Sequence, residues 1–223
     1  MRSFDEILEI AARRKGSAEA VMAAASQPKT SDALAAIPND RWLSQMAQGI
    51  FQAGISWTVV QNKWPGIEEA FDRFDVGRVA LMSPDRFDAL LSDRRIIRSA
   101  PKVQAIQQNA VLIQEVSSRH GSFGRFIADW PAKDYAGLLK WLKTNGARLG
   151  GNTGAYMLRV MGKDSYILSQ DVVARLVAEG IVDKAPTSAR AMRAVQDAFN
   201  QWRAESGRNF NEISRVLAQS IDG

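Results

Sequence analysis

The segment from residue 146 to residue 154 combines small and flexible residues in a pattern suited to binding a phosphate. Gly150 and Gly151 allow a tight turn and place no Cβ between the backbone amides and a ligand. The helix expected after Gly151 starts with unpaired N–H groups and the positive end of its dipole. The same residues also suit a tight helical hairpin that binds nothing, so both interpretations stay open.

Composition narrows the chemistry available elsewhere in the chain. There is no Cys, which excludes disulfides, thiolate metal sites and a Cys nucleophile. His120 is the one His, so a Ser-His catalytic triad has a single candidate base. The net charge of +5 and the pI of about 9.7 favour a polyanionic partner, although a charge of this size is weak evidence by itself.

Helical periodicity covers nearly the whole chain and predicts an all-α fold. Phe4, Ile7, Leu8 and Ala11, for example, recur on one helical face. Residues 166–168 are too short for a strand and have no partner. Asn145-Gly146 is expected to stop a helix in left-handed geometry, and Pro65 is expected to lie at the start of another helix.

The chain is expected to fold as an N-terminal helical extension over residues 1–38, packed on a helical body over residues 39–223. Acidic residues near the N-terminus argue against a secretory leader, and no apolar stretch is long enough to span a bilayer. The expected location is therefore the cytoplasm, in association with the nucleoid, and no membrane partner is expected.

Residues 149–155, LGGNTGA, resemble the signature of the helix-hairpin-helix DNA glycosylases, with the hairpin over residues 138–161. The resemblance implies a two-lobed helical fold with a DNA cleft between the lobes. In that superfamily a catalytic Asp follows the hairpin after one more helix and a loop, and Asp171 lies twenty residues past Gly151. Bifunctional lyases of the superfamily carry Lys at the position of Thr153, so the resemblance implies a monofunctional enzyme.

Asp171 suits that chemistry. Cleavage of an N-glycosidic bond develops positive charge on the sugar, which an ionised carboxylate stabilises directly or by orienting a water molecule. Asp171 is expected to begin a helix, where the dipole favours the ionised form. The alternative is that Asp171 serves only as the helix N-cap.

The middle of the chain resembles a narrower family, the type I 3-methyladenine DNA glycosylases. The matching pieces, in order, are QAGISW at 52–57, FDRFD at 71–75, RIIRSAPKVQAIQQNA at 95–110 and GSF at 121–123. Gly146, Gly151 and Tyr156 continue the pattern, so the resemblance covers roughly residues 43–160.

In that family the Trp of the SW pair stacks on the excised base, which implies this role for Trp57. Core packing is the alternative for this side chain. The resemblance and the residue types place the base pocket at Trp57, Gln52, Gln48, Gly49, Tyr156 and Trp42. Three of these have structural alternatives: a cap on a buried turn for Gln52, packing beneath the cleft for Tyr156, and the core for Trp42.

Two departures from the family pattern stand out. Gly49 occupies the position of a Glu that reads the base, so we expect a larger and uncharged pocket, with Gln48 beside it. The family also holds a structural zinc through Cys and His near both termini. This chain has no Cys, so no metal is expected, and the terminal segments are expected to pack the ends together instead.

The resemblance and the charge pattern predict binding of double-stranded DNA that contains a damaged base, by a monomer without a cofactor. The expected DNA contacts are Gly150, Gly151, Asn152, Thr153, Gly154, Arg148, Lys143 and Lys102. The implied activity is excision of an alkylated purine such as 3-methyladenine. Two alternatives remain: a glycosylase for a different damaged base, and a non-catalytic DNA-binding protein whose pocket has degenerated.

Overall fold

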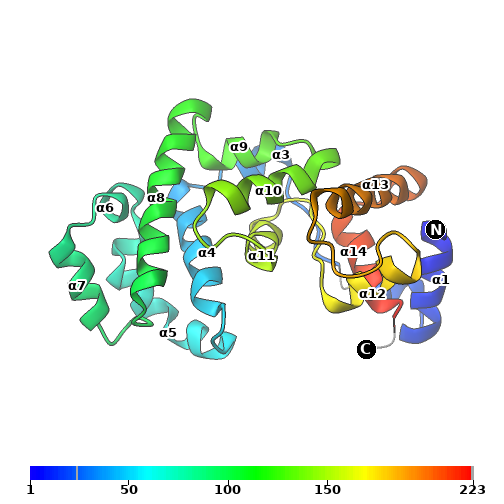
Figure 1. Cartoon of the computed structure of the whole chain (residues 1–223), viewed down its shortest axis with the longest axis horizontal. Coiled ribbons are helices and arrows are strands. Elements are labelled where there is room, and N and C mark those ends of the chain that lie inside the picture. The colour runs from blue at the N-terminus through cyan, green and yellow to red at the C-terminus, as the bar shows by residue number, and fades with distance from the viewer. Residues whose placement is uncertain (24, 222–223) are drawn as a thin grey trace. The chain divides into compact units, whose positions relative to one another are not determined.

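A computed structural model describes residues 1–23 and 25–221 of the chain. Within these residues there is no β-strand, which confirms the predicted all-α fold. Figure 1 shows the helices. They are α1 (Phe4–Lys15), α2 (Ala18–Ala23), α3 (Ser31–Ala35), α4 (Asn39–Gln52), α5 (Trp57–Ala70), η1 (Asp72–Phe74), α6 (Val76–Ala80), α7 (Pro84–Ser92), α8 (Ala100–His120), α9 (Phe123–Asp129), η2 (Ala132–Asp134), α10 (Tyr135–Asn145), α11 (Asn152–Met161), α12 (Gln170–Ala178), α13 (Ala189–Ser206) and α14 (Phe210–Gln219).

Local sequence explains many of these boundaries. Ser3 and Asn209 form capping boxes at the starts of α1 and α14, each with a Glu three residues later. The expected helix start at Pro65 is wrong, because α5 continues through this residue. Val60 and Ile67 are buried on either side of Pro65, so burial of the helix face outweighs the backbone bond that proline cannot form.

The chain forms two compact units, each built from segments that are discontinuous in sequence. The terminal unit contains Met1–Lys29, Pro131–Leu138 and Leu158–Gly223, and the central unit contains Thr30–Trp130 and Leu139–Met157. The proposed division of the chain at residue 38 stays a prediction.

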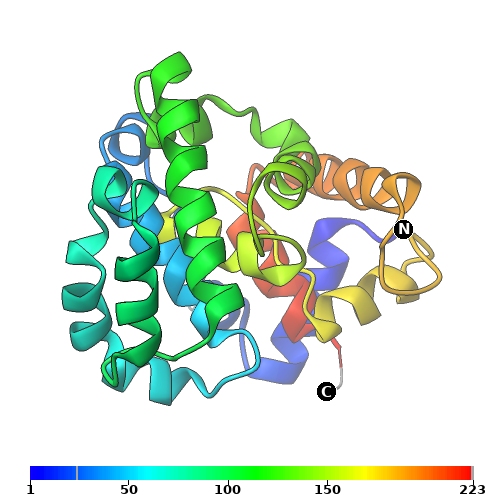
Figure 2. The same ribbon diagram turned by 60° about the vertical axis from the view of Figure 1, so that its left-hand side comes forward.

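In the terminal unit, the N-terminal α1 packs against α13 and α14 near the other end of the chain. Figures 1 and 2 both show α1, in blue, beside α14, in red. Aromatic side chains fill the interior; Tyr166, for example, stacks on Phe199 with 4.2 Å between the ring centroids. The two ends of the chain are therefore held together by burial of apolar surface.

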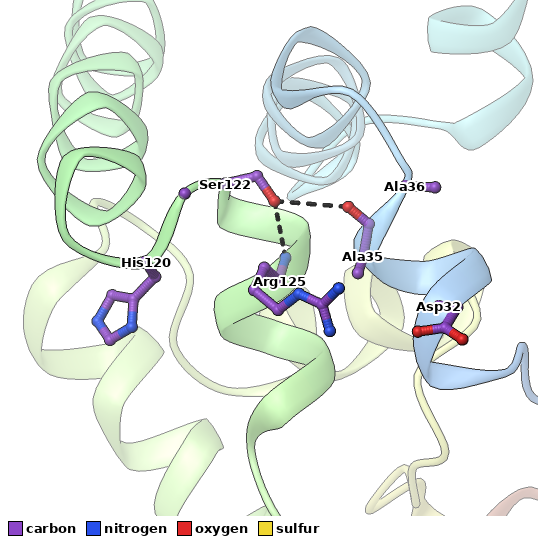
Figure 3. A pocket seen from close by; sticks show the side chains of 7 residues that line it. Asp32, Ala35, Ala36, His120, Ser122 and Arg125 are labelled. Atoms are coloured by element: carbon purple, nitrogen blue, oxygen red, sulfur yellow. Dashed lines mark hydrogen bonds between the residues drawn. The ribbon is translucent and has the colours of Figure 1, made fainter.

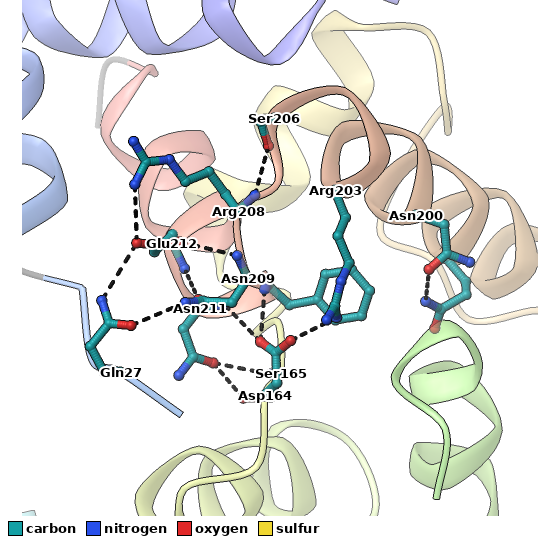
Figure 4. Close-up of polar contacts among 12 residues, drawn as sticks. Gln27, Asp164, Ser165, Asn200, Arg203, Ser206, Arg208, Asn209, Asn211 and Glu212 are labelled. Carbon is teal, nitrogen blue, oxygen red and sulfur yellow. Dashed lines mark hydrogen bonds and ion pairs between the residues drawn. The ribbon is translucent and has the colours of Figure 1, made fainter. Parts of the chain in front are cut away.

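Polar contacts reinforce this unit (Figure 4). Asp164 accepts hydrogen bonds from the Phe210 N–H at 2.7 Å and from the Arg203 guanidinium at 2.8 Å, which ties the start of α14 to α13. Asn211 accepts from the Ser165 N–H and donates to the Ser26 carbonyl, each at 3.0 Å. No group of three or more His, Cys, Asp or Glu side chains that could hold a metal occurs in residues 1–23 or 25–221, so these residues do not fit a structural zinc like that of the family the sequence resembles.

A buried ion pair joins α12 to both ends of the chain. Glu179 accepts from Arg175 at 3.1 Å and from Arg2 at 2.8 Å. Arg175 also donates to the Ser220 side chain at 2.7 Å. Burial by itself raises the pKa of Glu179, but the bonds from Arg2 and Arg175 outweigh burial and leave the pKa below the ordinary 4.5.

Glu179→Gln is expected to lower the free energy of unfolding at pH 7 by about 3 kcal/mol or more, because it leaves the buried Arg175 without its counter-ion. A carboxylate with a depressed folded pKa stabilises the fold above its unfolded pKa, and this stabilisation is lost as the pH falls through the folded value. The difference in free energy of unfolding between Glu179→Gln and the wild type should therefore shrink below about pH 4.5. Urea unfolding at pH values above and below 4.5 measures this difference. Equal losses of unfolding free energy in Glu179→Gln and in Glu9→Gln, which alters an exposed carboxylate, would contradict the prediction.

In the central unit, α8 is the longest helix, and α4, α6, α7 and α9 pack against it. Its buried face carries Val103, Ile106, Ala110 and Ile113 at helical spacing. No helix within residues 1–23 and 25–221 is long and apolar enough to cross a bilayer. The central unit also contains all of the predicted DNA-binding and base-binding residues.

Candidate nucleic-acid and base-binding site

The predicted hairpin connects α10 to α11 through residues 146–151. The helix stop is confirmed, since α10 ends at Asn145 and the Gly146 N–H donates to the Leu142 carbonyl at 2.9 Å. The expected left-handed geometry occurs later than predicted, at Arg148 (φ 59°) and Gly151 (φ 58°). Two left-handed residues within four positions reverse the chain direction within a short connection.

Glycine is required at two hairpin positions because another chain segment passes close by. A Cβ on Gly154 would lie 2.5 Å from the Leu149 carbonyl oxygen, and one on Gly146 would lie 2.8 Å from the Leu142 carbonyl oxygen. The buried Leu149 side chain anchors the middle of the turn. The hairpin is thus a tightly packed turn whose exposed residues are Arg148, Gly151 and Asn152.

Asn109 of α8 holds the hairpin in place, although it is not among the residues predicted for the site. Its side-chain amide donates to the Ala147 carbonyl at 3.0 Å, and its oxygen accepts from the Ala147 N–H at 2.8 Å. Asn109 is fully buried. The available signal was a polar residue on an otherwise apolar helical stripe, between Ile106 and Ala110, since such residues are usually paired when buried.

Trp57 and Tyr156 form an exposed aromatic pair. Trp57 is the first residue of α5, and 53% of its surface is accessible. Its ring meets Tyr156 of α11 edge to face, with 5.7 Å between centroids at 89°. The alternative of core packing is therefore wrong for Trp57, which presents an indole surface to solvent beside the second hairpin helix.

Trp42, in contrast to Trp57, is buried. It has no accessible surface and packs edge to face on Phe123 at 5.5 Å, so its predicted place in the base pocket is wrong. Its helical periodicity directs it into the core between α4 and α9. Gln48 and Gln52 of α4 are half-buried, and their side chains form no hydrogen bond within the part of the chain that the structure describes.

Gly49 lies against the first turn of α11, and the larger pocket expected there stays a prediction. A Cβ there would lie 3.1 Å from the Thr153 methyl carbon, tighter than ordinary van der Waals contact. The space beside Gly49 is therefore already occupied by the first turn of α11. The predicted pocket residue Gly49 and the predicted DNA-contact residue Thr153 lie against each other.

Lys102 was predicted to contact a DNA phosphate, but in the structure its ammonium binds main-chain carbonyls. Its ammonium donates to the carbonyls of Phe51 at 3.0 Å and Ala53 at 2.7 Å, at the C-terminal end of α4. Burial, followed by repulsion from Arg148, lowers the pKa of Lys102. Two of its three donors thus bind main chain, whereas Arg148 and Lys143 have exposed side chains at the hairpin.

Asp171 belongs to the terminal unit, in the first turn of α12. The alternative that it is the N-cap is wrong: Ser169 caps the helix, and its hydroxyl accepts from the Val172 N–H at 3.3 Å. Asp171 is half-buried and forms no hydrogen bond or ion pair within residues 1–23 and 25–221. Its carboxylate is therefore not committed to a structural partner.

A separate cavity of about 290 Å³ lies in the central unit where α3, the end of α8 and the start of α9 meet (Figure 3). His120, the last residue of α8, lines it together with Asp32 and Arg125. The Ser122 hydroxyl accepts from the Arg125 N–H at 2.9 Å, so it is used as the N-cap of α9. The same hydroxyl donates to the Ala35 carbonyl at 3.4 Å, so among the described residues no hydrogen bond joins Ser122 to His120 as a catalytic pair would require.

Gly154→Ala is expected to lower the free energy of unfolding by about 1–3 kcal/mol, because its methyl group would overlap the Leu149 carbonyl and force the hairpin apart. Gly150→Ala is the matched control, since its new methyl group would meet only the flexible Lys143 side chain at 3.2 Å. Thermal unfolding measures both. A smaller loss of unfolding free energy in Gly154→Ala than in Gly150→Ala would contradict this close packing of Gly154 on the Leu149 carbonyl.

Known proteins resemble this chain in sequence and in fold. The model of the methyladenine glycosylase family matches residues 38–158, more than half of the chain. A curated relative, DNA-3-methyladenine glycosylase of Haemophilus influenzae, is 34% identical over 76 residues, which is 34% of this chain. The chain spans about two fifths (41%) of the length of that relative, and the corresponding enzyme 1 of Escherichia coli gives the same values.

Solved structures extend the likeness of the fold. A 3-methyladenine DNA glycosylase I from Staphylococcus aureus is similar with a TM-score of 0.52 and 24% identity, over 67% of this chain and 86% of that one. An 8-oxoguanine DNA glycosylase from Methanocaldococcus jannaschii is similar with a TM-score of 0.52 and 14% identity, over 95% and 89%. The structural neighbours support the fold, and the sequence match over residues 38–158 shows that the chain belongs to the methyladenine glycosylase family.

Proposed function

We propose that the protein is a monofunctional DNA glycosylase that removes an alkylated purine, such as 3-methyladenine, from double-stranded DNA. The observation that carries the proposal is the exposed Trp57 and its contact with Tyr156. A base that leaves the duplex loses a few kcal/mol of stacking, and a flat aromatic surface offsets that loss. Names of the matched relatives support the choice of an alkylated base.

In this proposal the indole of Trp57 also selects the substrate. An alkylated purine with a positive charge is attracted to the electron-rich face of an indole. Gly49 supplies no carboxylate, and the Thr153 methyl group excludes a longer side chain there without movement. Recognition would therefore rely on stacking, with Gln48 and Gln52 as the nearby neutral hydrogen-bonding groups, which favours a wider range of damaged bases.

The hairpin residues Gly150, Gly151, Asn152, Thr153 and Gly154 would hold the DNA backbone, and Arg148 and Lys143 would add charge. Exposure of Arg148, Gly151 and Asn152 supports this assignment. Such contacts position DNA without reading its sequence. Binding should weaken as salt rises, because each phosphate contact releases counterions.

Asp171 would carry the chemistry. Asp171 lies in the first turn of α12, and no structural hydrogen bond or ion pair occupies its carboxylate among the described residues. The carboxylate would stabilise the positive charge on the sugar or orient the attacking water. Thr153 supplies no amine for a lyase step, no cofactor enters the scheme, and the protein would act as a monomer in association with the nucleoid.

The test is chromatography of bases released from methylated duplex DNA, with a DNA-binding titration at several salt concentrations. Release of 3-methyladenine, with affinity falling as salt rises, is the expected result. Release of another damaged base would show that the protein has a different substrate specificity from the one proposed. Salt-dependent binding without release of any methylated base would contradict the proposal and leave two alternatives: a glycosylase for a different kind of damaged base, or a non-catalytic DNA-binding protein.

A further inference from the structure

Helix α8 contacts two loops that the proposed function requires. Near its start, Lys102 donates to the carbonyls of Phe51 and Ala53, at the end of α4. That end leads within four residues to Trp57, the proposed base-stacking residue. A positive charge is favourable at a helix C-terminus, so Lys102 both caps α4 and fixes where the connection to α5 begins.

Further along α8, Asn109 forms two hydrogen bonds with the hairpin loop, one as donor and one as acceptor. It donates to the Ala147 carbonyl at 3.0 Å and accepts from the Ala147 N–H at 2.8 Å. Ala147 precedes Arg148, whose left-handed backbone directs the chain into the hairpin turn. Both backbone groups of Ala147 are thereby satisfied by one buried side chain.

The spacing of the two contacts is the informative feature. Lys102 and Asn109 are seven residues apart, which is about two helical turns, so both lie on the same face of α8 and about 10 Å apart along its axis. The Val103 and Ile106 side chains between them are fully buried. A single rigid helix therefore sets the distance between the α4–α5 loop and the hairpin loop, all within the central unit.

We infer that Lys102 and Asn109 are positioning residues, which together hold the base-stacking loop and the DNA-binding hairpin at a set separation. The inference rests on the proposed function for its consequences, and on the hydrogen bonds for its geometry. Lys102 acts on Trp57 through the main chain of α4, whereas Asn109 acts on the hairpin through Ala147. Positioning matters for catalysis, because displacement of a bound group by about 1 Å can lower rates by up to about 100-fold.

Lys102→Met separates this role from a phosphate contact, since it keeps the apolar stem and removes the charge. If Lys102 is a positioning residue, the slope of log affinity against log salt stays at the wild-type value, while kcat falls about tenfold or more with little change in KM. Loss of a phosphate contact would instead make the slope shallower by about 0.9. Lys143→Met, at the exposed end of α10, serves as the comparison for such a phosphate contact.

Amide hydrogen exchange tests both contacts without relying on activity. Lys102→Met should speed exchange in residues 53–57, and Asn109→Ala should speed exchange in residues 146–151 and weaken DNA binding about tenfold. Exchange in α6 is the internal reference for global destabilisation. Gln108→Ala, an exposed neighbour on the same helix, is the matched control. If Asn109→Ala fails to fold, Asn109→Asp keeps an acceptor for the Ala147 N–H and replaces the donor with a carboxylate oxygen that faces the Ala147 carbonyl.

A shallower salt slope in Lys102→Met with unchanged exchange at 53–57 would overturn the inference for Lys102. Exchange at 146–151 in Asn109→Ala (or in Asn109→Asp, if Asn109→Ala does not fold) no faster than in Gln108→Ala would overturn it for Asn109. Absence of base release by the wild-type protein would defeat the proposed function alone, because the exchange results would still decide whether α8 positions the two loops.

Discussion

Asp171→Asn is expected to reduce base release by about 100- to 1,000-fold or more while DNA affinity stays close to that of the wild type. The amide has nearly the same shape as the carboxylate but lacks the charge that stabilises a cationic sugar. Ser169, not Asp171, caps α12, so the substitution should leave the helix intact. Single-turnover release from methylated duplex DNA, together with a binding titration, measures the two effects separately.

Asp183→Asn is the matched control, because Asp183 is an exposed Asp of the same unit. It should retain full activity. Equal activity in Asp171→Asn and Asp183→Asn would remove Asp171 from the mechanism, even if the wild-type protein releases bases. Loss of DNA affinity in Asp171→Asn in parallel with activity would indicate a binding role instead of a chemical one.

Trp57→Ala should lower kcat/KM by about 5- to 150-fold, which corresponds to the 1–3 kcal/mol that stacking of a base on an aromatic side chain contributes. Stability should change little, because more than half of the Trp57 surface is already exposed. Trp57→Phe keeps an aromatic face and should recover part of the activity. The measurement is the initial rate of base release as a function of DNA concentration, alongside thermal unfolding.

Trp42→Ala gives the opposite pattern and serves as the control for Trp57→Ala. Trp42 is completely buried against Phe123, so its removal should cost about 3–5 kcal/mol of stability. If Trp57→Ala lost stability to a similar extent and kept its activity, Trp57 would be a structural residue. The proposed base-stacking site would then have to lie elsewhere.

The fold class and the hairpin could be predicted from sequence because they depend on local patterns. Helical periodicity indicated an all-α chain, and Asn145-Gly146 predicted the end of α10 correctly. The hairpin glycines matched a known signature, and the structure adds the close contact of Gly154 with the Leu149 carbonyl that requires glycine there. Errors arose where local signals compete, as at Pro65, where burial on both sides keeps α5 continuous.

The roles of individual site residues were harder to predict. Trp42 and Trp57 are both tryptophans at or near helix starts in the central unit, yet one is fully buried and the other is exposed beside Tyr156. Lys102 belongs to a basic run in the sequence, but its ammonium binds the end of α4. Asn109 is one of several polar residues in α8, and its hydrogen-bond partner Ala147 is 38 residues away along the chain.

The sequence by itself determined the helical fold, the hairpin and the family, because periodicity, capping and glycine-rich turns act between residues a few positions apart. The tertiary structure decided that Trp57 is exposed, that Thr153 fills the space beside Gly49, and that α8 holds two loops through Lys102 and Asn109. These features depend on which helix faces meet. Side-chain burial and hydrogen bonding between distant segments are set by packing of the whole unit, which no local pattern contains.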